Sequence, residues 1–142
     1  MEKKILASLK SKNNDASSGL AEWKKTKTIG IHLVAELVGC DFETLNDEKK
    51  IKEAMLNASA AAKFTVLDVL IKKFNPQGVT ALLLLSESHF SLHSWPEMGY
   101  AAVDMFTCSK TSDPQEAFKV LLNYFKPKRY TSREMARGPN AV

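Results

Sequence analysis

Three short apolar segments follow one another between residues 79 and 107, separated by only a few turn residues. Residues 79–85 are an apolar run that is too short for a typical helix and suits a buried strand. Residues 90–95, which end at a proline, and residues 100–107 are of the same type. Strands joined by such short connections favour antiparallel pairing, so we expect an antiparallel sheet at the centre of the fold.

Three further strands and two helices are expected around this group. Residues 29–37 alternate apolar with other residues, residues 64–74 are rich in apolar and β-branched residues, and residues 129–135 form a last candidate strand. The resulting order, β-α-β-β-β-β-α-β, predicts an α+β fold. This fold is a two-layer α/β sandwich, in which a mainly antiparallel sheet is covered on one face by two helices. The other face of the sheet needs cover, which a second subunit can supply.

Each expected helix has a start signal in the sequence. Asn46 can cap the first helix, which presents apolar residues at helical spacing within residues 51–62. Asp113 can cap the second helix, and Glu116 completes a capping box with it. We therefore expect the two helices to begin directly after these two capping residues.

The net charge is concentrated at the N-terminus. Residues 1–28 hold seven lysines and three acidic residues, which account for the whole formal charge of +4. We expect residues 1–25 to be a basic, disordered tail and residues 26–142, which have a globular composition, to form one domain. A groove for nucleic acid would draw basic residues from the folded part, so nucleic acid is not an expected partner.

The sequence also bears on where the protein is found. It has no run of about 18 apolar residues that could span a membrane, and its basic start lacks the apolar region of a secretory signal. The two cysteines, Cys40 and Cys108, are too few for a disulfide scaffold. We therefore expect a cytoplasmic protein with reduced thiols that does not bind a membrane.

Most of the reactive side chains lie in residues 86–97, and Cys108 follows closely. Polar groups crowded between apolar strands favour a functional site, although an exposed loop is the simpler alternative. His89 and His93 could share a metal on a helix, but on a strand they would lie roughly 13 Å apart, so no metal is expected. Ser88 and His93 could meet across a turn as in a Ser-His hydrolase, but the sequence has no G-x-S-x-G motif. Each of these residues is also compatible with an ordinary structural role.

Five sequence blocks stand out between residues 30 and 104. They are Gly30-Ile31-His32-Leu33, Gly39-Cys40-Asp41-Phe42, Ser86-Glu87-Ser88-His89, His93-Ser94-Trp95-Pro96-Glu97 and Gly99-Tyr100-Ala101-Ala102-Val103-Asp104. Together they closely resemble the S-adenosylmethionine decarboxylase proenzymes of bacteria and archaea. The resemblance covers residues 29–125, and one departure is Ser109, where the family usually has glycine.

The resemblance implies a zymogen that cuts itself between Glu87 and Ser88. Ser88 then becomes a pyruvoyl group, the only cofactor expected, without a metal or pyridoxal phosphate. His93 matches the base of this processing, and Thr80 stands where the family has a processing hydroxyl, often serine. The pyruvoyl carbonyl forms a Schiff base with the substrate amine, and Cys108 matches the donor of a proton to the decarboxylated product.

The resemblance also implies a substrate and a partner. Phe74 and Trp95 match aromatic positions that contact the sulfonium and adenine of S-adenosylmethionine, and Glu97 matches an acceptor for the ribose hydroxyls. The expected carboxy-lyase product is decarboxylated S-adenosylmethionine, the aminopropyl donor of spermidine and polyamine biosynthesis. Family members form sites between subunits, so we expect a homodimer of cleaved protomers.

Other functions stay open at this point. Relatives on the same scaffold decarboxylate arginine or ornithine with the same group, and such substrates need no adenine site. A non-catalytic homologue would act as a partner subunit and stay uncut, although Ser88, His93 and Cys108 are retained. A binding module for a polyanion would use the basic tail.

Overall fold

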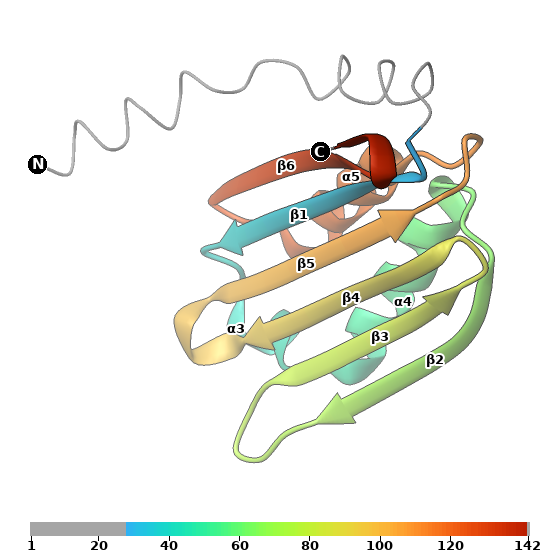
Figure 1. The fold of residues 1–142 in the computed structure, drawn as a ribbon. Helices are drawn as coiled ribbons and strands as arrows, with labels where there is room; N and C mark the ends of the chain where they lie inside the picture. The colour runs from blue at the N-terminus through green and yellow to red at the C-terminus, as the bar shows by residue number, and fades with distance from the viewer. Residues whose placement is uncertain (1–27, 142) are drawn as a thin grey trace, which may run out of the picture.

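The computed structural model of the chain describes residues 28–141 (Figure 1). The strands are β1 (Gly30–Val38), β2 (Val66–Lys73), β3 (Val79–Leu85), β4 (Ser88–Trp95), β5 (Tyr100–Thr107) and β6 (Arg129–Arg137). The helices are α3 (Phe42–Leu45), α4 (Glu48–Ala61) and α5 (Pro114–Phe125), with short 3-10 helices η1 (Pro96–Met98) and η2 (Pro139–Ala141). None of these helices is long and apolar enough to cross a membrane. The tail expected in residues 1–25 lies outside the described residues.

All six strands form one antiparallel sheet with the order β2-β3-β4-β5-β1-β6. α4 and α5 pack against each other and lie together behind the sheet in Figure 1. Within residues 28–141 no α-helix covers the opposite face, which we call the open face. The predicted two-layer α/β sandwich with helices on one face is therefore confirmed.

Strand alternation decides which side chains lie on each face. On β1 the odd-numbered residues from Ile31 to Leu37 are buried, and on β4 the even-numbered residues from Phe90 to Ser94 are buried. Successive side chains of a strand point to opposite faces. The odd-numbered residues of β4, which include both of its histidines, therefore lie on the open face.

The cap of α4 differs from the prediction. Asp47 caps this helix, because its carboxylate accepts hydrogen bonds from the backbone N–H groups of Lys49 and Lys50. Asn46 instead ends α3, a one-turn helix that the sequence did not predict, and its side-chain oxygen accepts from the Gly78 N–H. The side chain of Asn46 therefore ties α3 to the β2-β3 turn.

The start of α5 is partly as predicted. Asp113 caps the helix, and its carboxylate accepts from the Gln115 N–H. The predicted capping box is wrong, because the Asp113 N–H donates to the Ala62 carbonyl and the Glu116 carboxylate pairs with Lys119. The hydrogen bond to Ala62 connects the start of α5 to the end of α4.

β4 begins earlier than predicted. The expected strand was 90–95, but Ser88 already pairs with Leu85 of β3 and with Thr107 of β5. β3 and β4 therefore form a hairpin with a two-residue connection, Ser86 and Glu87. The early start places Ser88 inside the sheet.

Candidate active site

The expected cleavage site lies at the tip of the β3-β4 hairpin. Glu87 ends the connection, and Ser88 opens β4 with a φ angle of 151°. Residues other than glycine rarely adopt a φ angle in this range, and holding one there costs on the order of 1–3 kcal/mol. The strain lies at the N–Cα bond of Ser88, directly beside the Glu87–Ser88 peptide bond.

The Glu87 carbonyl is held by a neighbouring strand. Its oxygen accepts a hydrogen bond of 2.9 Å from the backbone N–H of Cys108, which follows the last residue of β5. The Glu87 carboxylate also accepts from the Thr65 N–H at 3.0 Å. A donor aimed at a carbonyl oxygen stabilises the negative charge that develops there during nucleophilic attack. The backbone N–H of Cys108, whose side chain is exposed, is therefore placed to stabilise an attack on the Glu87 carbonyl.

Ser109, the departure from the family pattern, fits its position. Its N–H donates to the Thr107 hydroxyl, and its own hydroxyl lies 3.0 Å from that of Thr111. Among the described residues, Ser109 is not one of those with a positive φ angle. A serine side chain is therefore accommodated there without backbone strain.

A second group of expected site residues surrounds the other end of β4. Thr80 and His93 are cross-strand partners, and Thr80 Oγ1 lies 2.9 Å from His93 Nδ1. The His93 ring is 6.4 Å from the ring of Trp95, which stacks on Tyr100 at 5.2 Å. Phe74, directly after β2, and Glu97, in η1, are exposed. An imidazole, aromatic rings and a carboxylate are thus available at one end of the sheet.

Tyr100 supports this second group from the next strand. Its hydroxyl donates a hydrogen bond to the Glu36 carboxylate, and this bond raises the pKa of Tyr100 to about 12. A protonated phenol keeps its hydrogen bond, so the ring is held in place beneath Trp95. The stacked pair provides a rigid aromatic surface.

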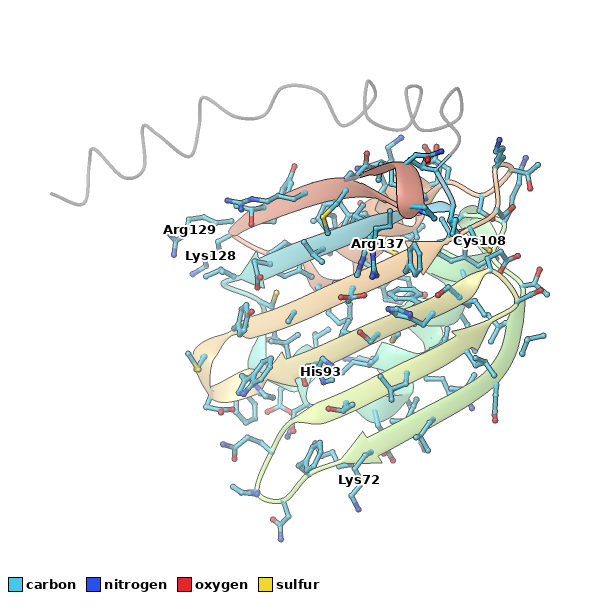
Figure 2. All side chains as sticks on the ribbon, viewed as in Figure 1. Lys72, His93, Cys108, Lys128, Arg129 and Arg137 are labelled. Carbon is cyan, nitrogen blue, oxygen red and sulfur yellow. The ribbon has the colours of Figure 1, made fainter. Side chains whose placement is uncertain are left out.

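The two groups do not meet within one chain. Ser88 and His93 are the first and sixth residues of β4, which places their Cα atoms roughly 17 Å apart by the strand rise. Figure 2 shows Cys108 at one end of the sheet and His93 well away from it, inside the sheet. A proton-transfer base needs a heavy-atom distance of about 3 Å from its target. The interpretation in which Ser88 and His93 of one chain meet across a turn is therefore wrong.

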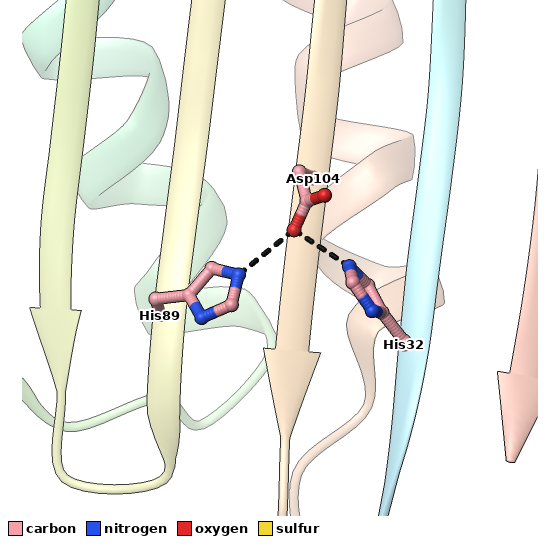
Figure 3. Close-up of side chains that lie close together, drawn as sticks. All are labelled: His32, His89 and Asp104. Atoms are coloured by element: carbon pink, nitrogen blue, oxygen red, sulfur yellow. Dashed lines mark hydrogen bonds and ion pairs between the residues drawn. The ribbon is translucent and has the colours of Figure 1, made fainter. Parts of the chain in front are cut away.

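A third group of polar side chains was missed by the sequence prediction. His32, His89 and Asp104 come from β1, β4 and β5 and meet on the open face (Figure 3). Asp104 Oδ1 lies 2.7 Å from His32 Nε2 and 2.9 Å from His89 Nε2. All three residues lie in the sequence blocks noted above, but only the pairing of β5 with both neighbours brings them together.

The third group bears on the metal interpretation. His89 and His93 have different partners at different places on β4, so they form no joint metal site, as expected for a strand. The ligand atoms of His32, His89 and Asp104, in contrast, all lie within 4.8 Å of one another. Two imidazoles and a carboxylate are a donor set that divalent metals accept.

Comparison with known proteins agrees with the expected family. The family model described as S-adenosylmethionine decarboxylase matches residues 31–138. The S-adenosylmethionine decarboxylase proenzyme of Pelotomaculum thermopropionicum is 47% identical over 112 residues, which are 79% of this chain and 89% of that protein. The proenzyme of Carboxydothermus hydrogenoformans is 46% identical over 110 residues, which are 78% of this chain and 87% of that protein.

A solved structure shares the fold as well. The crystal structure of the adenosylmethionine decarboxylase from Aquifex aeolicus aligns with a TM-score of 0.73 and 33% identity, covering 80% of this chain and 93% of that one. Sequence and structure comparisons thus agree over nearly all of the described residues. The chain belongs to the S-adenosylmethionine decarboxylase family of carboxy-lyases.

Proposed function

We propose that the chain is a proenzyme that cleaves itself between Glu87 and Ser88, forms a pyruvoyl group from Ser88 and decarboxylates S-adenosylmethionine. The observation that carries this proposal is the geometry of one peptide bond. Ser88 has a strained positive φ angle, and the Glu87 carbonyl oxygen accepts a hydrogen bond from the Cys108 N–H. The relatives named S-adenosylmethionine decarboxylase proenzyme favour this substrate over arginine and ornithine.

The first part of the proposal is self-cleavage. Ser88 Oγ attacks the Glu87 carbonyl carbon, a new C–O bond forms as the amide C–N bond breaks, and an ester results. A base then removes the α-proton of residue 88, which expels the Glu87 carboxylate and leaves dehydroalanine. Tautomerisation and hydrolysis of dehydroalanine give the pyruvoyl group and ammonia. We assign removal of the α-proton to His93, oriented by Thr80 through the 2.9 Å contact.

The second part is the decarboxylation. A pyruvoyl group supplies an electron sink for the electrons released with carbon dioxide. Cys108 is the proposed donor of the proton that the product requires. Its backbone N–H donates a hydrogen bond to the Glu87 carbonyl oxygen, and its thiol is free and exposed. Cys108 thus has a proposed role in both parts, through its backbone N–H in the self-cleavage and through its thiol in the decarboxylation.

The exposed aromatic side chains suit a cationic, adenine-containing substrate. Trp95 is 39% exposed and Phe74 is 48% exposed, and aromatic faces attract a sulfonium and stack on an adenine. The exposed Glu97 carboxylate can accept hydrogen bonds from ribose hydroxyls. We propose these three side chains as the binding site for S-adenosylmethionine.

A homodimer follows from the separation of the two groups. His93 cannot reach Ser88 of its own chain, so a site that uses both residues must draw them from two copies. The open face also exposes Leu70, Leu82 and Leu84, which are 66%, 39% and 55% exposed. An exposed apolar patch of this kind marks an interaction surface. We propose that two copies pair through their open faces and complete two sites.

The product and the location complete the proposal. Decarboxylated S-adenosylmethionine donates aminopropyl groups, which places the reaction in spermidine and polyamine biosynthesis. Both cysteines, Cys40 and Cys108, are free, which supports a location in the reducing cytoplasm.

The experiment combines intact mass with carbon dioxide release. Purified protein should consist of two fragments divided before residue 88, the second carrying a carbonyl that borohydride reduces. It should release carbon dioxide from S-adenosylmethionine and not from arginine or ornithine. The Ser88→Ala variant should be one intact, inactive chain. An intact wild-type chain would support a non-catalytic homologue, and preferred turnover of arginine or ornithine would overturn the substrate assignment.

A further inference from the structure

The third polar group connects directly to the nucleophile. His89 Nδ1 lies 3.3 Å from Ser88 Oγ, and His89 Nε2 lies 2.9 Å from Asp104 Oδ1. Hydroxyl, imidazole and carboxylate thus follow one another in the order that serine hydrolases use to activate a serine. All three belong to one chain, whereas His93 is at the other end of β4.

The hydrogen-bond partners of His32 indicate which of its ring nitrogens donates and which accepts. Arg137 Nη1 lies 3.2 Å from His32 Nδ1, and a guanidinium can only donate. His32 Nδ1 is therefore the acceptor, and its Nε2–H donates to Asp104. The Arg137 guanidinium is itself held over the Phe106 ring, 4.8 Å from its centroid.

The same argument applies to His89. An ionised carboxylate can only accept, so His89 Nε2 carries the proton that binds Asp104. In the neutral form of the ring this is the only N–H, so Nδ1 then has a free lone pair facing Ser88 Oγ. Asp104 therefore holds His89 in the tautomer that can receive a proton from the Ser88 hydroxyl.

We propose that His89 is the catalytic base of the first cleavage step, with Asp104 and His32 as positioning residues. The inference rests on the self-cleavage proposed above. His89 Nδ1 takes the proton from Ser88 Oγ as Oγ bonds to the Glu87 carbonyl carbon. The Cys108 N–H stabilises the carbonyl oxygen during the attack. The breaking C–N bond leaves its electron pair on the Ser88 nitrogen, which receives the proton back from His89, so no other reactant is needed.

This assignment gives the two histidines of β4 different steps. His89 serves the shift from amide to ester within one chain, and His93 serves the later elimination. The His93 ring cannot serve the first step in its own chain, since it lies five residues further along β4 with its Nδ1 against Thr80 Oγ1. The two steps can therefore be measured separately.

The experiment uses the full chain with His93→Ala, which blocks elimination and leaves the ester as the last product. Hydroxylamine cleaves an ester and not a peptide bond, so the rate of hydroxylamine-dependent cleavage before residue 88 reports ester formation. Adding His89→Ala should lower this rate at least about 100-fold, the usual contribution of a general base. Added imidazole should restore part of the rate, which a misfolded variant would not allow.

The positioning role has its own readout. Asp104→Asn should lower the same rate to a similar extent, because an amide can donate to His89 Nε2 and move the ring proton to Nδ1. Residues that act as a unit give non-additive losses, so Asp104→Asn together with His89→Ala should lose no more than His89→Ala alone. Glu48→Gln, which changes an exposed carboxylate at the start of α4 on the other side of the sheet, is the control and should keep the rate.

The outcomes separate this inference from the proposed function. If His93→Ala is cleaved by hydroxylamine and His89→Ala does not change the rate, self-cleavage stands and the role of His89 is refuted. If neither the wild-type chain nor His93→Ala is ever cut before residue 88, the proposed function itself fails. Loss of ester formation in EDTA with recovery in Zn²⁺ would refute the base and assign His32, His89 and Asp104 to a metal.

Discussion

Subunit complementation tests the separation of Ser88 from His93 most directly. The roughly 17 Å between them along β4 exceeds by far the distance of about 3 Å over which a base removes a proton. The Ser88→Ala and His93→Ala chains should therefore each fail to mature alone. In a mixed dimer, however, one of the two sites combines an intact Ser88 from one chain with an intact His93 from the other.

The expected yield follows from two-fold symmetry. Random pairing of equal amounts of the two variants makes about half of all dimers mixed. About half of the His93→Ala chains should then be cut before residue 88, and none of the Ser88→Ala chains. Co-expression with different affinity tags, followed by intact mass analysis, measures both fractions.

The reciprocal mixture is the control. A chain that carries both substitutions, paired with wild type, leaves every site of a mixed dimer incomplete, so about half of the wild-type chains should stay uncut at equal expression. A site contained within one chain would give the opposite pattern. No maturation of mixed single variants, and complete maturation of wild type beside the double variant, would refute the shared site.

Three further predictions concern single residues. Burial raises the pKa of the Cys40 thiol to about 11, so a disulfide reagent such as DTNB should react quickly with only one thiol per native chain, the exposed Cys108. Cys108→Ser should remove this fast phase. Two thiols that react quickly would contradict the burial of Cys40. Because the folded pKa of Tyr100 is raised from 10.0 to about 12, its contribution to stability is present below the unfolded pKa and is lost as pH rises through about 12. Tyr100→Phe should remove the latest component of the tyrosine absorbance titration, and an unchanged titration would exclude the Glu36 bond. Phe90 is fully buried, so Phe90→Ala in uncut Ser88→Ala protein should lower the free energy of unfolding by about 3–5 kcal/mol, measured by urea denaturation. Met98→Ala, at an exposed position, should change the free energy of unfolding by less than about 0.5 kcal/mol. A loss for Phe90→Ala as small as that for Met98→Ala would show that Phe90 is not part of the core.

The fold was predictable because its signals are local. Alternation along residues 29–37 and the short connections between residues 79 and 107 determine strands and antiparallel neighbours without knowledge of distant contacts. The helix caps were less predictable, because Asn46 and Asp47 are both good capping residues and only the fold decides between them. The Asn46 side chain instead accepts a hydrogen bond from the backbone N–H of Gly78, which is far away in the sequence.

The residues of the proposed site were named from the sequence, but their arrangement could not be. The family resemblance singled out Ser88, His93 and Cys108, but it did not indicate that the first two are five residues apart on one extended strand. The group of His32, His89 and Asp104 could not be predicted from the sequence, because His32 and Asp104 are 72 residues apart. A period-two reading of each strand places all three on one face, and only the strand order makes them neighbours.

The position of each group on β4 has a consequence for the order of events. The strained Ser88 backbone, the backbone N–H of Cys108 and the proposed His89 base belong to one chain, so under this proposal the shift from amide to ester can begin in a single folded protomer. In the mechanism proposed above, the elimination uses His93 of a second copy, so it waits for the open faces to meet. The ester can return to the amide until elimination occurs, so a chain without a partner can form the ester and still revert to the intact polypeptide. The irreversible step is thereby tied to assembly, and a chain becomes committed to cleavage only where a complete substrate site also exists.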